Sequence, residues 1–205
     1  MYRIRQYCVA LLLVSTAIVA HGAATEEASP QNLVQVTVSD AIADIQANEA
    51  IYRDDKAKLR AMIETRIAPH FSFERMTQLA LGQNWKNATS EQRQKITAEF
   101  RRLLIRSYSN SLYDYRTEIP NIKIATQSEK NNMAVVRVDV DSNDGRSAVL
   151  YIRMEKKAAG WRVIDVMVNG VSLIVNYRAS FASEIAQGGF DGLISMLETE
   201  NSKEQ

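Results

Sequence analysis

The apolar residues of this chain change their spacing at Pro120, and this change constrains the fold more than any other feature. Before Pro120 they recur with the helical period of about 3.6 residues, whereas the segments NIKIATQS and MAVVRVDVDS that follow it alternate with period 2. A helical half followed by a strand half favours an α+β protein over an alternating α/β protein.

Two further short segments after Pro120, SAVLYIRME and WRVIDVMV, are rich in β-branched residues and complete a set of four predicted strands. The turn sequences Asn143-Asp144-Gly145 and Ala158-Ala159-Gly160 separate neighbouring strands. Strands joined by such short turns predict an antiparallel four-stranded sheet. A sheet of this kind normally keeps one face for the core.

The helical half contains several amphipathic segments. Apolar spacing predicts helices over 33–45, 54–67 and 72–81. Thr89 and Gln92 form a capping box that starts a long helix ending near Tyr115. After the strands, Ser172 is the expected N-cap of another helix, which runs to Gly188-Gly189 and is followed by a short helix.

Residues 1–24 resemble a secretory signal peptide. Arg3 and Arg5 precede an apolar run over 7–20, and small residues follow at 22–24. We expect cleavage after Gly22 or Ala24, with an uncleaved N-terminal anchor as the alternative. The run is too short for a typical membrane span.

Cleavage would also change the thiol content and the charge of the chain. Cys8, the only cysteine, would be lost, which excludes a disulfide or a thiolate metal site in the mature chain. Without Arg3 and Arg5, 23 basic residues face 24 acidic ones, a net charge of −1. Such a chain has no bulk attraction to nucleic acid or anionic lipid. We expect one domain over 25–200 and a polar tail over 201–205.

The sequence carries no strong catalytic or metal-binding signature. It lacks a glycine-rich phosphate loop and a paired-histidine motif, and after cleavage His70 is the only histidine left. Asp165 is the one candidate acid, because it interrupts the apolar run VIDVMV and could serve as a tuned general base. Strand alternation could equally direct it towards solvent or towards an arginine.

Several motifs, in order, resemble those of the MlaC family, the toluene-tolerance auxiliary proteins. LALGQNWKNATSEQRQKITAEFRRLLIRSYSNSL is similar to the family's pattern of L-G-x-x-W/Y, then A-T/S-x-x-Q-R and an aromatic-bearing helix. DGRSAVLYIRM, GWRVIDVMVNGVSLIVNYRASF and GGFDGLISML resemble its later motifs. Asp144, which lies between Asn143 and Gly145, is a small departure from the family's N-G-R turn. The match covers nearly all of the mature chain.

The resemblance implies a decorated NTF2-like fold with an apolar pocket between sheet and helices, in a monomeric periplasmic phospholipid carrier of a Gram-negative cell. Such carriers move lipid between an outer-membrane lipoprotein–porin complex and an inner-membrane ABC transporter with a substrate-binding hexamer, and so maintain outer-membrane lipid asymmetry. They are not enzymes and use no cofactor, since the phospholipid is their cargo. Arg93 and Arg146 match basic family positions and are candidate partner contacts; ordinary solvated charge is the alternative.

Ten apolar positions are the expected acyl-chain site. Tyr108 and Val171 match family positions near the lipid, and the others follow from strand alternation and helical phase. The set comprises Leu104, Tyr108, Leu112, Val138, Leu150, Ile152, Val166, Val168, Val171 and Ile174. The same residues could instead fill a solid core. Two other functions remain open: an NTF2-like enzyme that acts on a hydrophobic substrate with Asp165 as base, and a lipoprotein chaperone of the LolA type.

Overall fold

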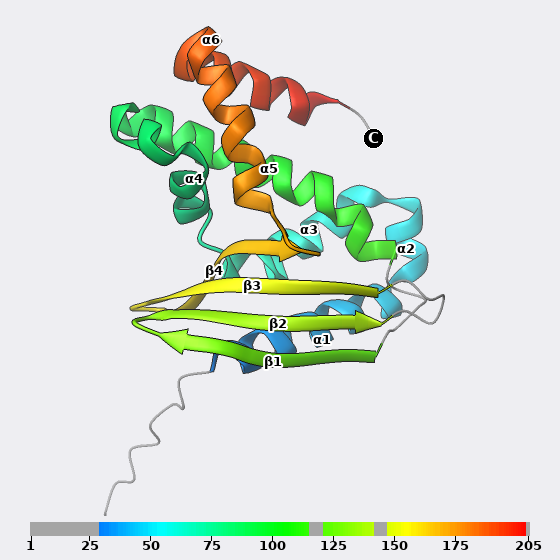
Figure 1. Ribbon diagram of the computed structural model, residues 1–205. Coiled ribbons are helices and arrows are strands. Elements are labelled where there is room, and N and C mark those ends of the chain that lie inside the picture. Colours follow the sequence, from blue (N-terminus) through cyan, green and yellow to red (C-terminus); the bar gives the residue numbers. More distant parts are fainter. Residues whose placement is uncertain (1–28, 115–120, 142–146, 204–205) are drawn as a thin grey trace, which may run out of the picture.

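The computed structural model describes residues 29–114, 121–141 and 147–203 (Figure 1). Its helices are α1 (Pro30–Ala47), α2 (Glu49–Asp54), α3 (Lys56–Arg66), α4 (Phe73–Leu81), α5 (Ser90–Asp114) and α6 (Leu173–Ser202), with 3-10 turns η1 (Ala68–His70) and η2 (Gly82–Asn87). Its strands are β1 (Asn121–Lys130), β2 (Met133–Asp141), β3 (Ser147–Lys157), β4 (Gly160–Val168) and β5 (Val171–Ser172). The expected α+β class is confirmed.

The strands form one antiparallel sheet in the order β1-β2-β3-β4-β5. The sequence predicted four strands, and the fifth is the two-residue β5, which pairs with the end of β4. Asn131 and Asn132 both have positive φ, 53° and 61°, at the β1–β2 turn. Asparagine tolerates this conformation better than most residues, so the pair makes a tight hairpin.

The elements form two parts that meet at β4. Helix α1 lies across one face of the sheet, while α4, α5 and α6 gather beyond the β4 edge (Figure 1). Phe71 extends the sheet on that side through a parallel bridge to Val163. The N–H of Ser72 donates to the carbonyl of Val163 over 2.9 Å. The helical part is therefore attached to the sheet directly before α4 and directly after β5.

Local signals start and bend the helices as expected. Thr89 and Gln92 exchange reciprocal hydrogen bonds of 3.1 Å, which confirms the capping box before α5. The Ser172 hydroxyl accepts from the N–H of Val175 over 3.1 Å and caps α6. Helix α6 bends at Gly189, whose φ of 66° and ψ of −165° are not helical, and it extends to Ser202, past the expected domain end at 200.

Three apolar clusters form the core. The helical cluster joins α4, α5 and α6 around Phe100 and Phe181, both fully buried. A second cluster joins α1, α2, α3 and α5, and a third joins the sheet to α1. Each fully buried large side chain stabilises the fold by about 1.5–3 kcal/mol relative to exposure. The core therefore consists of three separate clusters and not of one continuous layer.

Several predictions fall on residues that the structure does not describe. The signal segment 1–24 and the turn at 143–145 both lie outside the described residues. In the described ranges, none of the helices combines the length and the apolar character that a membrane crossing requires.

Candidate functional site

One face of the sheet is apolar from strand to strand. Val138 is paired with Ile124 on β1 and with Leu150 on β3, and directly opposite residues of antiparallel strands share a face. Ile152 is paired with Val136 and Val166, and Leu150 with Val168. The structure therefore brings the five predicted strand positions together on what we call the apolar face. The face consists of Ile122, Ile124, Val136, Val138, Val140, Leu150, Ile152, Met154, Val163, Val166 and Val168.

Burial of the apolar face is uneven. Val136 and Val138 are 0% and 3% exposed, because α1 packs over β1 and β2 through Val34 and Val38. Leu150, Ile152 and Val166 are only half-buried, and Val168 is 36% exposed. The β3–β4 part of the apolar face towards Val168 is therefore incompletely covered, which is unusual for aliphatic side chains beside a core.

A cavity of about 470 Å³ opens between α1 and β1, on the side of the sheet that carries the apolar face. Val38 and Ile42 of α1 line it opposite Ile122 and Ile124 of β1, with Gln35, Ser39, Ala43 and Gln46 at its remaining wall. Ligand cavities of a few hundred Å³ with mostly apolar walls and a few polar groups are typical of small-molecule sites. The sequence analysis did not include these four aliphatic residues in the site, although their helical and alternating spacing is visible in the sequence.

The helix-borne candidates lie elsewhere. Leu104 and Ile174, 6% and 2% exposed, pack inside the helical cluster with α4 and α6. The reason is that α5 packs on α3, α4 and α6, whereas α1 is the helix that covers the apolar face. Leu112 lies in the last turn of α5, and its side chain is outside those that the structure describes.

Tyr108 and Val171 are exposed candidates at the junction of α5, β5 and α6. The exposed fraction is 39% for Tyr108 and 62% for Val171. Val175, in the first turn of α6, is 59% exposed. Burial, together with the charge of the neighbouring Tyr108 and its hydrogen bond, raises the pKa of the Tyr177 phenol to about 12. The junction therefore presents aliphatic surface next to the hydrogen-bonded phenols of Tyr108 and Tyr177.

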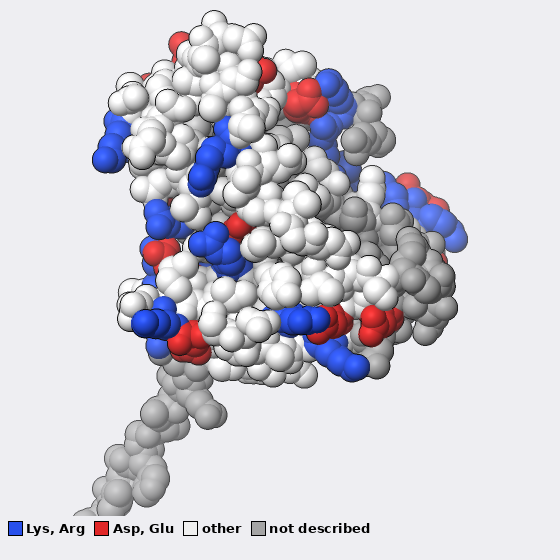
Figure 2. Space-filling view, in the orientation of Figure 1, with Lys and Arg blue, Asp and Glu red and all other residues white. Residues whose placement is uncertain are grey.

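The opposite face of the sheet is polar. Arg137 donates to Asp139 over 2.7 Å, and Tyr151 lies beneath the Arg137 guanidinium. Figure 2 shows charged side chains of both signs side by side over the strands on this face. Asp139 therefore lies on the polar face, opposite to its neighbours Val138 and Val140.

Asp165 is a structural carboxylate. It is 1% exposed, and its oxygens accept from the Ser172 hydroxyl over 2.7 Å and from the N–H of Ile174 over 3.3 Å. Arg153 approaches to 3.6 Å, which is the arginine alternative of the sequence analysis. Each carboxylate oxygen thus accepts a hydrogen bond from the segment that joins β4 to α6. The geometry therefore provides no free base facing a cavity.

Of the two basic candidates for partner contact, the structure describes Arg93 and does not describe Arg146. Arg93 lies over the Trp85 ring, and its guanidinium donates to the carbonyls of Trp85 and Lys86 over 3.0 and 3.3 Å. It thereby holds η2 against the start of α5. Arg146 lies outside the described residues. The described residues also include no group of three or more His, Cys, Asp or Glu side chains that could hold a metal ion.

The fold and the site define an α+β protein whose antiparallel sheet presents an apolar face beside a cavity. Residues 35–199 match the family model described as MlaC protein. The chain belongs to the MlaC family.

Individual relatives agree with this membership. The chain is 28% identical to the intermembrane phospholipid transport system binding protein MlaC of Haemophilus influenzae, over 98% of this chain and 95% of that protein. It is 24% identical to the toluene tolerance protein ttg2D of Pseudomonas putida, over 80% and 76% of the two chains. The fold matches a phospholipid-binding protein from Ralstonia solanacearum, solved in complex with a phospholipid, with a TM-score of 0.74 and 33% identity over 84% of this chain and 96% of that chain.

Proposed function

We propose that this protein binds phospholipid in intermembrane phospholipid transport, as a carrier that holds acyl chains and carries out no turnover chemistry. The observation that supports this most directly is the incompletely covered apolar face beside a cavity of about 470 Å³. The chain that carries it is 33% identical to a protein solved with a phospholipid.

The energetics explain why such a carrier is needed. A phospholipid with two long chains exposes on the order of 30 methylenes, and transferring them to water costs ~24 kcal/mol at ~0.8 kcal/mol each. A lipid therefore does not cross an aqueous compartment unaided. Aliphatic walls without unpaired donors, such as Ile124, Leu150 and Val166, replace the membrane interior at little desolvation cost.

The finer parts of the proposal rest on the family resemblance. The carrier works as a monomer in the periplasm, after removal of residues 1–24. It exchanges lipid with an outer-membrane lipoprotein–porin complex and with an inner-membrane ABC transporter that carries a substrate-binding hexamer. Residues 25–200 make up the lipid-binding domain. Its acyl-chain contacts are the ten positions named above other than Leu104 and Ile174, which pack inside the helical cluster, and Val38, Ile42, Ile122 and Ile124 are added to them.

The test is native mass spectrometry of the purified protein, followed by lipid extraction. We expect co-purifying diacyl phospholipid in the wild type and little in Ile42→Asp, which places a charge in the cavity wall. Val36→Asp is the matched control, because Val36 is 49% exposed on the same helix and lines no part of the cavity. Protein without any lipid, or equal lipid in both variants, would contradict the proposal. A bound lipoprotein instead of free lipid would favour the chaperone alternative.

A further inference from the structure

A second cavity lies between helices and shares no lining residue with the cavity beside the apolar face. It has a volume of about 690 Å³ and lies between α3, α5 and the last turn of α6. Arg60, Arg102, Arg106 and Lys203 contribute four cationic side chains to its wall, and Glu64 is the one acid among the lining residues. Nothing in the proposed acyl-chain function uses it.

The neighbouring acids compensate these cations only in part. Glu64 pairs with Arg101, Arg102 donates to Glu99 over 3.1 Å, and Lys203 pairs with Glu200. Five cationic groups, Arg60, Arg101, Arg102, Arg106 and Lys203, therefore meet the three carboxylates of Glu64, Glu99 and Glu200. Among the described residues the local charge is thus net positive by two, although the mature chain is close to neutral.

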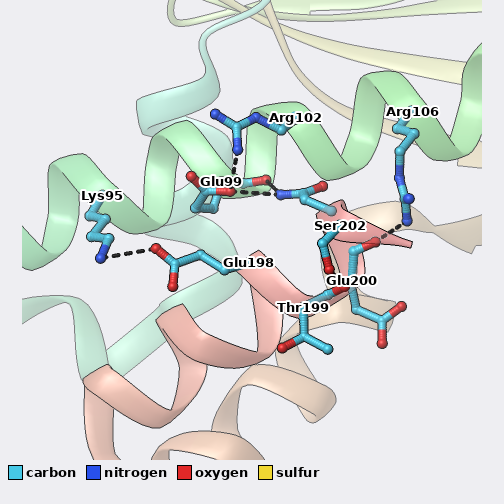
Figure 3. Close-up of polar contacts among 9 residues, drawn as sticks. Lys95, Glu99, Arg102, Arg106, Glu198, Thr199, Glu200 and Ser202 are labelled. Atoms are coloured by element: carbon cyan, nitrogen blue, oxygen red, sulfur yellow. Dashed lines mark hydrogen bonds and ion pairs between the residues drawn. The ribbon is translucent and has the colours of Figure 1, made fainter. Parts of the chain in front are cut away.

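The two uncompensated groups are Arg60 and Arg106. Within the described part of the chain, Arg60 is half-buried and has no hydrogen bond or ion pair. One terminal N–H group of Arg106 donates to the carbonyl of Glu200 at the end of α6 (Figure 3), and the other donates to the carbonyl of Lys203. The Nε of Arg106 is buried with no partner among the described residues. Half-buried guanidinium donors without acceptors lose hydration and gain nothing in return, so an anion in the cavity would restore their hydrogen bonds.

The chemistry of the wall also specifies the kind of anion. Three of the four lining cations are arginines, whose planar donor forks match phosphate oxygens in pairs. The buried Oδ1 of Asn201 has no donor among the described residues and could accept from a hydroxyl of the ligand. We propose that the α3–α5–α6 cavity binds a phosphate-bearing anion, either a soluble organophosphate or the headgroup of an anionic phospholipid.

The test compares Arg60→Gln with Lys58→Gln, which removes the same charge from an exposed position on the same helix. Titration calorimetry at low salt with glycerol 3-phosphate and with succinate reports on soluble anions. Co-sedimentation with phosphatidylcholine vesicles, with and without phosphatidylglycerol, reports on headgroups. We expect Arg60→Gln to weaken binding about tenfold or more, because one charge-assisted interaction is lost. Lys58→Gln should bind as the wild type does.

The outcomes are distinct. Arg60-dependent binding of glycerol 3-phosphate identifies a soluble ligand, and Arg60-dependent binding seen only on phosphatidylglycerol vesicles identifies a headgroup; both support the proposal. Binding that ignores the Arg60 change, or succinate bound as tightly as the phosphate, would overturn it. Lipid co-purification with Arg60→Gln should match the wild type, so this test and that of the acyl-chain function fail separately.

Discussion

Removal of the Asp165 carboxylate tests whether this residue is a structural anchor or a catalytic base. Asp165→Ala leaves the Ser172 hydroxyl and the N–H of Ile174 without their acceptor at a site where Asp165 is 1% exposed. Each buried donor left unpaired costs about 1–3 kcal/mol. Arg153 adds little, because its side chain is 43% exposed. The 3.3 Å bond to Ile174 is long, so we expect a loss of about 2–4 kcal/mol in total.

Urea denaturation followed by circular dichroism measures this loss. Asp165→Asn keeps the shape and an acceptor oxygen, so we expect a smaller cost of about 1 kcal/mol. Asp139→Ala is the control, because Asp139 pairs with a neighbour on the polar face and its loss should cost less than about 1 kcal/mol. If Asp165→Ala were as stable as Asp139→Ala, the anchoring argument would fail. A turnover reaction abolished by Asp165→Asn with lipid binding intact would favour the enzyme hypothesis instead.

Two further predictions concern the bend in α6 and the histidine next to Pro69. Gly189→Ala should lower the free energy of unfolding in urea by about 1–3 kcal/mol, since φ of 66° with ψ of −165° is open essentially to glycine alone. The control is Gly188→Ala, where an added Cβ has free space, so this variant should lose less. Equal losses in the two variants would contradict the argument. Burial, followed by the charge of Arg162, lowers the pKa of His70 below 6.5, so the unfolded chain binds the proton more readily. The Tm should therefore fall as the pH drops from 6.5 towards the folded-state pKa. A His70→Gln variant should lose less stability over that range, and an identical pH profile would contradict the assignment.

Much of the sheet was predictable because strand alternation is a strictly local signal. The predicted positions Val138, Leu150 and Val166 share one face, since period 2 along each strand and short turns between strands fix the register together. The same logic does not reach β5, which has two residues, or α2, which has six. Elements this short complete no period, and they form through contacts that only the folded chain supplies.

The partner of each helix could not be read from the sequence. Both α1 and α5 carry an apolar stripe, and a stripe shows that a helix has an inner side without showing which surface covers it. Leu104 was therefore expected over the sheet, whereas it packs against α4 and α6. Asp165 shows the same limit, because alternation left solvent and arginine as equal alternatives, and the capping contact to α6 depends on where β5 turns.

Helices α1 and α5 pack against different surfaces, and this difference leaves part of the apolar face open to a ligand. Helix α1 packs over two adjacent strands of the sheet, β1 and β2, and leaves the apolar face of β3 and β4 less completely covered. Had α5 packed over β3 and β4, then Leu150, Ile152 and Val166 would be as buried as Val136. Because α5 packs in the helical cluster instead, the side chains of Leu150, Ile152 and Val166 stay partly exposed. An acyl chain is the kind of ligand that can cover them, since it offers aliphatic surface and demands no hydrogen bond.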